Sequence, residues 1–228
     1  AAVFCHAVNL IDGMNGLAGS VSTVAAIGLA VIASRAGLPE VASISWIIAA
    51  APVGFLVLNW PSAKLFLGDA GAYGLGHVLV WVGISIVALN LSVAVSAVIL
   101  VLFYPFADTI HTVVRRLVTK KNVMQPDRMH LHQKIRRTLE VAWLGRNQRA
   151  ISNPLTTAIL LPVIVAPVVT GILLWNQPGM AWAMIAFYAA MFTATNYLVA
   201  MLAKRFRMNG CDPCVGSEWI ARASDKSS

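Results

Sequence analysis

The chain has 228 residues, of which 58% are hydrophobic and 11% are charged. A soluble domain carries about a quarter charged residues, so this composition and a mean hydropathy of +0.74 exclude that class and indicate an integral membrane protein. A net charge of +8 would also suit a nucleic-acid-binding protein. The basic residues cluster between apolar segments, however, which is the pattern of membrane topology, and we expect no nucleic-acid partner.

Six apolar segments each approach the length of about 20 residues that a helix needs to cross the hydrocarbon core. They lie at 17–34, 41–58, 72–89, 92–114, 155–175 and 180–203. The sequence therefore predicts an all-α, polytopic membrane protein. Because the chain opens with apolar residues rather than with Met, we interpret residues 1–228 as the C-terminal part of one transmembrane domain within a larger helical bundle.

The connections between these predicted spans are of two kinds. The turns at 36–40, 90–91 and 176–179 are short and almost uncharged, whereas the loop at 115–153 and the tail at 204–228 are basic. By the positive-inside rule, the basic connections are cytoplasmic. Two spans separate Asp12 from Asp69, and two more separate Asp69 from the basic loop. An even number of crossings returns the chain to the same side, so all three regions should meet at the cytoplasmic face.

The first polar stretch contains Asn9, Asp12 and Asn15, which recur every three residues. On a helical turn they would share one face. Asp and Asn are also preferred N-cap residues, and a cap on the following span would explain one of them. It would not explain three in register, and we favour a binding site.

The second stretch places Asp69 between two strongly apolar segments. A carboxylate is costly there without a partner, although an N-cap is again the simpler alternative. Asp12 and Asp69 together offer the oxygen ligands that suit Mg²⁺, which retains waters and binds substrate phosphates. Lys64 either pairs with an anionic ligand or only marks the cytoplasmic side.

The third stretch, inside the basic loop, carries Arg128, His130 and His132. Histidines two residues apart share a face in an extended segment but not on a helix. A zinc site is disfavoured because this loop has no cysteine. Arginine and imidazole groups donate to phosphate oxygens, so phosphate recognition fits better than a loop that is merely attracted to anionic lipids.

Other candidate site residues have less support in the sequence. Asp108 and His111 lie three residues apart near the end of the fourth predicted span, and we interpret them as a structural pair on one helix face. We interpret His77 as a packing residue. The main rival function is a secondary transporter, but a transporter concentrates polar residues at the bilayer midplane, whereas these gather at one face. A non-catalytic membrane scaffold would leave the three stretches unexplained.

Taken together, the three stretches resemble motifs of the polyprenyl-phosphate N-acetylhexosamine-1-phosphate transferase family. This family includes the enzymes that initiate surface polysaccharides and the phospho-MurNAc-pentapeptide translocase. Residues 9–17, Asn-Leu-Ile-Asp-Gly-Met-Asn-Gly-Leu, resemble its Asn-x-x-Asp-Gly-x-(Asp/Asn)-Gly-Leu motif. Residues 66–71 resemble Phe-(Met/Leu)-Gly-Asp-x-Gly, and residues 127–132 resemble the family's histidine-containing cytoplasmic loop.

This resemblance implies a reaction at the cytoplasmic face of a bacterial inner membrane. A polyprenyl phosphate attacks the β-phosphate of a UDP-sugar and forms polyprenyl-diphospho-sugar and UMP, with Mg²⁺ or alternatively Mn²⁺. The partners implied are the lipid, the nucleotide sugar and the membrane, and a homodimer is compatible with them.

The resemblance also implies roles for individual residues. Asp69 would be a catalytic metal ligand, Asp12 and Asn9 would shape the metal and nucleotide site, and Phe66 would pack on the uracil. His130 and His132 would hold diphosphate oxygens. Substrate contacts are also expected from Asn15, Lys64 and Arg128.

Two departures from the family pattern matter. Position 15 is Asn where the translocase branch carries Asp, which favours the surface-polysaccharide branch. The family's Asp-Asp pair, linked to metal binding or to activation of the lipid phosphate, lies upstream of residue 1. We therefore expect residues 1–228 to be inactive by themselves.

Overall fold

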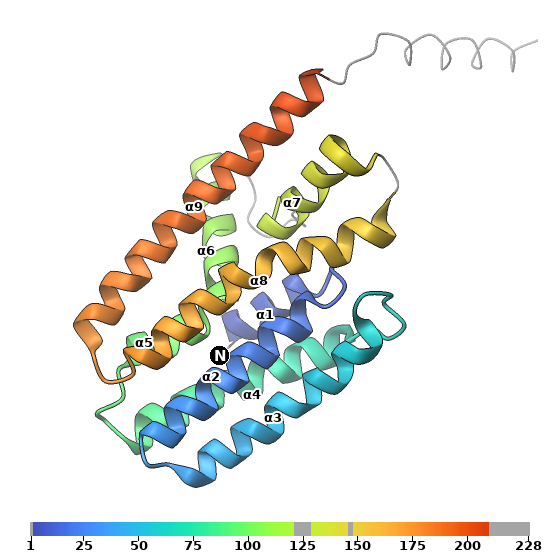
Figure 1. Cartoon of the computed structure of the whole chain (residues 1–228). Helices are drawn as coiled ribbons and strands as arrows, with labels where there is room; N and C mark the ends of the chain where they lie inside the picture. Colours follow the sequence, from blue (N-terminus) through green and yellow to red (C-terminus); the bar gives the residue numbers. More distant parts are fainter. Residues whose placement is uncertain (1, 121–128, 146–147, 210–228) are drawn as a thin grey trace, which may run out of the picture.

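The computed structural model describes residues 2–120, 129–145 and 148–209, and every regular element in those ranges is helical. The helices are α1 (Ala2–Ile11), α2 (Leu17–Arg35), α3 (Pro39–Asn59), α4 (Gly68–Leu89), α5 (Val95–Val101), α6 (Phe103–Val118), α7 (Leu131–Leu139), the π-helical turn η1 (Glu140–Leu144), α8 (Arg149–Leu173) and α9 (Pro178–Asn209). They run mostly alongside one another (Figure 1), which confirms the predicted all-α architecture.

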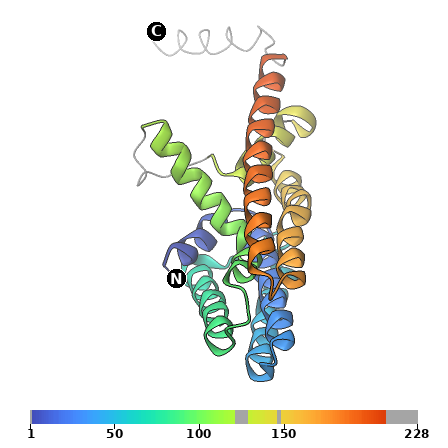
Figure 2. The same cartoon turned by 90° about the vertical axis from the view of Figure 1, so that its left-hand side faces the viewer.

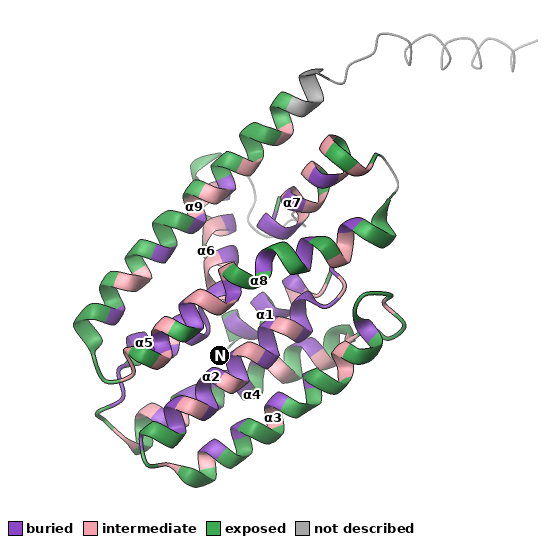
Figure 3. Ribbon diagram, in the orientation of Figure 1, coloured by how far each residue is buried: buried purple, intermediate pink, exposed green. Residues whose placement is uncertain are grey.

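Five of the helices are long and apolar enough to cross a membrane: α2, α3, α4, α8 and α9. They correspond to five of the six predicted spans. Helix α2 is central, with 67% of its apolar window buried, against 28% for α3 and 17% for α9. Figure 3 shows the same contrast between a largely buried α2 and the outward faces of α3 and α9. Apolar side chains left exposed on such helices face lipid, and the protein is a multi-pass membrane protein.

The fourth predicted span is not continuous, which corrects the sequence-based prediction. Helices α5 and α6 meet at an angle of 84°, and Figure 2 shows α6 leaving the direction of the neighbouring helices. Pro105 is the third residue of α6. In an unbroken helix it could not donate to the carbonyl of Val101, and its ring would clash with that carbonyl. The bend therefore falls one turn before the proline.

The predicted basic loop at 115–153 is also shorter than expected, because it contains a helix. Leu131, Ile135 and Leu139 recur every four residues, and all three are buried on α7. They join an apolar cluster with Leu17 of α2 and Leu160 of α8. This i, i+4, i+8 pattern is the usual signal of an amphipathic helix, and the surrounding basic residues obscured it.

The three short turns lie together at one end of the bundle. The side chain of Asn90 donates to the carbonyl of Ala36 at 2.9 Å, and the amide of Ala94 donates to the carbonyl of Trp175 at 2.7 Å. At the opposite end, Met14, Leu67 and Leu131 pack in or against one apolar cluster. These three residues belong to the three polar stretches, so the structure gathers those stretches at one end, as the parity of the spans predicts.

Helices α1 and α4 pack with their backbones in close approach. A Cβ atom built on Gly76 would lie 2.8 Å from the Cα of Cys5 and 3.3 Å from a methyl group of Val8. The first of these is a backbone atom, which cannot move aside as a flexible side chain could. Gly76 therefore sets the separation of the two helices that carry Asn9 and Asp69.

We predict that Gly76→Ala lowers the free energy of unfolding by about 1–3 kcal/mol, the usual cost of overpacking. Gly74→Ala, in the same helix, is the matched control, because a Cβ there meets nothing within 4 Å. The control should be neutral or gain up to about 1 kcal/mol from helix propensity. Unfolding in detergent measures both variants, and equal stabilities would contradict this account of the α1–α4 contact.

Candidate functional site

The first two polar stretches meet where α1 ends and α4 begins. The side chain of Asn9 donates to Oδ1 of Asp69 over 2.9 Å. The carboxyl group of Asp12 accepts a hydrogen bond from the Gly68 backbone. Because Asp69 lies in the first turn of α4, its negative charge is favoured by the helix dipole. Segments about 60 residues apart in the sequence therefore form one polar constellation.

The electrostatics of this constellation favour a cation. Partial burial raises the pKa of Asp12 from 3.8 to about 6, the nearby Asp69 adds to that rise, and the hydrogen bond from Gly68 opposes it. Because two neighbouring carboxylates repel each other, a positive charge placed between them would stabilise both.

Asn15 does not share a face with Asn9 and Asp12, which corrects the expectation from their spacing. Helix α1 ends at Ile11, and the next helix begins only after Gly16, whose φ of 81° is left-handed. A left-handed residue interrupts the helical register, and glycine adopts this conformation without strain. The side chain of Asn15 instead donates to the carbonyl of Pro61 over 2.7 Å. Its predicted contact with substrate stays a prediction.

Asn59 connects the first and second polar stretches through hydrogen bonds, and it was not predicted from the sequence. Its side-chain oxygen accepts from the amide of Gly16, and its side-chain nitrogen donates to the carbonyl of Leu65 at 2.7 Å. Asn59 is buried at the last residue of α3, where an amide ending an apolar span is the only signal in the sequence. It fixes the segments before α2 and before α4 relative to each other.

The remaining residues predicted around Asp69 lie at the surface. Phe66 is 74% exposed, and Lys64 is also exposed. An exposed aromatic ring beside a polar constellation is free to stack on a ligand. Arg128 lies outside the described residues, and substrate binding by all three stays a prediction.

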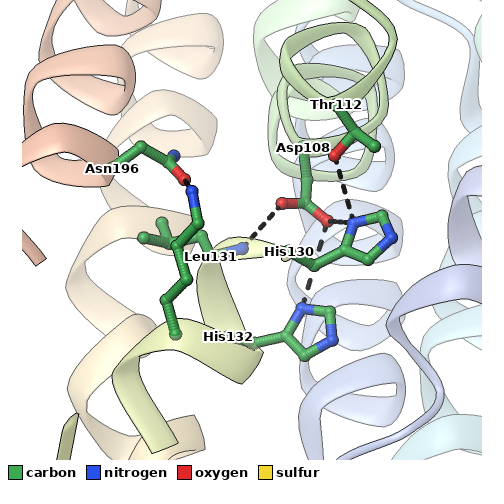
Figure 4. Close-up of polar contacts among 7 residues, drawn as sticks. Asp108, Thr112, His130, Leu131, His132 and Asn196 are labelled. Atoms are coloured by element: carbon green, nitrogen blue, oxygen red, sulfur yellow. Dashed lines mark hydrogen bonds and ion pairs between the residues drawn. The ribbon is translucent and has the colours of Figure 1, made fainter. Parts of the chain in front are cut away.

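The third polar stretch forms a buried cluster with Asp108 of α6 (Figure 4). Oδ2 of Asp108 lies 2.7 Å from Nδ1 of His130, and Oδ1 accepts from the amide of Leu131 at 3.1 Å. Oγ1 of Thr112, one turn along α6, lies 3.4 Å from the same His130 nitrogen. Asp108 and His130 are each 2% exposed, so the carboxyl group is desolvated and relies on these partners.

The two imidazoles are brought together, but only His130 is in an extended conformation. His130 directly precedes α7 and His132 is the second residue of that helix, and the two rings stack with centroids 5.6 Å apart. His132 is fully buried, and neither of its ring nitrogens has a hydrogen-bond partner among the described residues. Burial lowers the pKa of His132 to about 4, so the ring is neutral at pH 7.

The structure gives Asp108 a different partner from the one that its spacing to His111 predicts. Its carboxyl group bonds His130, and the His111 ring packs edge-on to Phe192 at 6.0 Å. The available signal was a carboxylate in an otherwise apolar segment. His6 and Tyr73 were also missed. They lie one turn beyond Asn9 and Asp69 on the same two helices, with Nδ1 and Oη 3.2 Å apart.

Fold and site together define a polytopic membrane protein whose acidic and histidine-containing segments converge at one end of a helical bundle. The sequence model of glycosyl transferase family 4 matches residues 1–87, which contain the first two polar stretches. The chain is therefore similar to this family over those residues, as its motifs indicated.

Individual relatives extend the similarity beyond those residues. The chain is 34% identical over 133 residues to a probable undecaprenyl-phosphate N-acetylglucosaminyl 1-phosphate transferase of Bacillus subtilis, covering 57% of this chain and 37% of the relative. It is 30% identical over 159 residues to a phospho-N-acetylmuramoyl-pentapeptide-transferase of Bacillus pumilus (70% and 46%). It is 28% identical over 203 residues to a decaprenyl-phosphate N-acetylglucosaminephosphotransferase of Mycobacterium tuberculosis (72% and 50%). The chain thus spans half or less of the length of each.

We predict that the carboxyl group of Asp12 titrates near pH 6 in the metal-free protein. Its folded pKa lies above the unfolded value, so its contribution to the free energy of unfolding falls as the pH rises from 3.8 to about 6. Infrared difference spectra of the wild type against Asp12→Asn report the protonated carboxyl group directly.

Asp69→Asn should lower the Asp12 midpoint, because it removes a neighbouring negative charge. Glu40→Gln, which removes an exposed carboxylate in the first turn of α3 at the opposite end, should leave it unchanged. An Asp12 midpoint near pH 4 in the wild type would show that the two carboxyl groups do not share a site. An Asp12 midpoint that is the same in the wild type and in Asp69→Asn would show the same.

Proposed function

We propose that the protein transfers a sugar-1-phosphate from a UDP-(N-acetyl)hexosamine to a polyprenyl phosphate, releasing UMP and forming a polyprenyl-diphospho-sugar. The observation that carries this proposal is the convergence of the Asn9–Asp69 constellation and the Asp108–histidine cluster at one end of the bundle. One substrate is a lipid and the other a soluble nucleotide, so their reaction requires a site at a membrane face. The names of the relatives support the same chemistry.

In the proposed mechanism, a phosphate oxygen of the lipid attacks the β-phosphorus of the nucleotide sugar. The bond from that phosphorus to the bridging oxygen breaks, and UMP leaves with this oxygen. Such a transfer needs positioning and neutralisation of charge more than covalent help. Asn9 fixes the orientation of the Asp69 carboxylate through its hydrogen bond. Phe66 stacks on the uracil, and His130 with His132 engages diphosphate oxygens.

The donor set at Asp12 and Asp69 suits Mg²⁺. Both carboxylates are oxygen ligands, the Asn9 side chain adds an amide oxygen, and the mutual repulsion of the carboxyl groups favours a bound cation. Among the described residues, no group of three or more acidic, histidine or cysteine side chains is placed to hold a metal ion by itself, so a cation here would need waters and substrate phosphates as further ligands. When bound, Mg²⁺ would neutralise the diphosphate and polarise the phosphorus that is attacked.

The distribution of charge supports a cytoplasmic site in a bacterial inner membrane. The turns at one end are short and nearly uncharged, and the basic segments lie at the end that carries the polar stretches. The same distribution argues against a secondary transporter. Asp69, Asp12 and His130 lie at helix ends, whereas a transporter needs its polar residues near the midplane.

We predict that Asp69→Asn, in membranes carrying the full-length protein, reduces UMP release from the accepted UDP-sugar by at least about 100-fold, the scale of a lost electrostatic contact to the transition state. The amide keeps the shape of the side chain but removes the charge. Glu40→Gln, at the other end of the bundle, is the control and should retain wild-type release.

A panel of UDP-sugars is needed for this assay, with polyprenyl phosphate added and omitted. Absence of UMP release by the wild type from every UDP-sugar would contradict the proposed function. Equal release by the wild type and Asp69→Asn would remove Asp69 from the mechanism.

A further inference from the structure

The carboxyl group of Asp108 is buried at the junction of α6 and α7 and has contacts on two sides. Oδ1 accepts from the amide of Leu131, the first residue of α7. Oδ2 lies against Nδ1 of His130 at 2.7 Å but remains 4.0 Å from Nδ1 of His132. The two histidines therefore differ: one is bonded to the carboxylate, and the other is only stacked beside it.

We propose that Asp108 is a positioning residue that acts through His130. The proposal rests on the proposed function, because it concerns the imidazole expected to engage the diphosphate. Asp108 keeps a proton on Nδ1 and fixes the plane of the ring, so that Nε2 is the nitrogen left for the substrate. When the ring is protonated, its remaining N–H points away from Asp108, and the carboxylate balances the imidazolium charge.

The distances show which contact fixes the orientation of the His130 ring. Nδ1 carries one proton, and its contact with Oδ2 of Asp108 at 2.7 Å is that of a charge-assisted hydrogen bond. The contact with Oγ1 of Thr112 at 3.4 Å is at the limit of hydrogen bonding. The amide of Leu131 holds the other carboxylate oxygen, so the carboxyl group cannot rotate without breaking a bond. Asp108 therefore orders His130, and Thr112 contributes little.

The segment that carries His130 is anchored on its other side as well. Nζ of Lys134 donates to the side-chain oxygen of Asn196, a buried residue of α9, at 2.8 Å. Figure 4 shows Asn196 and Asp108 on opposite sides of the start of α7. With both sides held, the start of α7 is pre-organised before substrate arrives, which is the condition for binding without a reordering cost.

Kinetics of the full-length protein test this proposal. Asp108→Asn should raise KM for the UDP-sugar about 10- to 100-fold, the range for loss of a hydrogen bond to a charged group, and leave KM for the polyprenyl phosphate unchanged. Thr112→Val, which removes only the long contact, is the matched control and should change neither constant more than about 2-fold.

A double-variant comparison separates positioning from a purely structural role. If Asp108 acts through His130, then Asp108→Asn should cost nothing further in a protein that already carries His130→Asn. If Asp108 only caps α7, the penalty of Asp108→Asn persists in that background. Penalties that add would overturn the proposal.

A second measurement needs neither turnover nor a variant. The ¹⁵N signals of His130 in the wild type should show Nδ1 protonated and in a strong hydrogen bond. A neutral ring with its proton on Nε2 instead would overturn the proposal even if Asp108→Asn failed to fold. Because this readout is independent of the reaction, absence of UMP release would refute the proposed function and leave this result intact.

Discussion

The close approach of α1 and α4 is the contact on which the rest of the site depends. Gly76 lets the two backbones meet at Cys5, and this separation brings the side chain of Asn9 within 2.9 Å of Asp69. A carboxylate at the start of a membrane helix is costly without partners. The helix dipole and the Asn9 amide offset part of that cost, so the packing of two apolar helices also positions the polar groups at their ends.

The carboxyl group of Asp108, in the histidine cluster, also needs partners, and it obtains them within the protein. Asp108 is fully desolvated, and its oxygens are satisfied by a backbone amide and by His130. The sharp bend before α6 changes the direction of the helix that carries this carboxyl group, and the buried stripe of α7 packs beside it. Burial leaves His132 neutral, whereas His130 is hydrogen-bonded to the carboxylate of Asp108.

Much of this arrangement could be predicted from the sequence, because the hydropathy of each segment can be read without knowing its tertiary contacts. Five spans, the short turns and the convergence of the three polar stretches follow from span parity and loop charge. The break before Phe103 could not be found by averaging hydropathy over a window, since α5 and α6 taken together are apolar enough to pass as one span. Nor did the three-residue spacing of Asn9, Asp12 and Asn15 predict the end of α1 at Ile11, where a turn replaces the helix.

The residues that sequence reasoning undervalued share a physical cause. Asp108 and Asn59 are single polar residues in apolar segments, and their partners are backbone groups or side chains distant in the sequence. The sequence pattern around a residue gives no information about such partners, because only the tertiary fold brings them together. The spacing of His130 and His132 indicated a site, but it could not indicate that, within the part of the chain that the structure describes, only His130 hydrogen-bonds to a carboxylate.

The central claim, that acidic and histidine segments from distant parts of the chain surround one metal-bound diphosphate, can be tested with Mn²⁺ as a paramagnetic probe. In the full-length protein with ¹⁵N-labelled histidine, bound Mn²⁺ should broaden the imidazole signals of His130 and His132, and Asp69→Asn should abolish this broadening at the same Mn²⁺ concentration. The two ends of the bundle are separated by a hydrocarbon core about 30 Å thick. Sharp signals from both histidines while Mn²⁺ is bound at Asp69 would contradict the account.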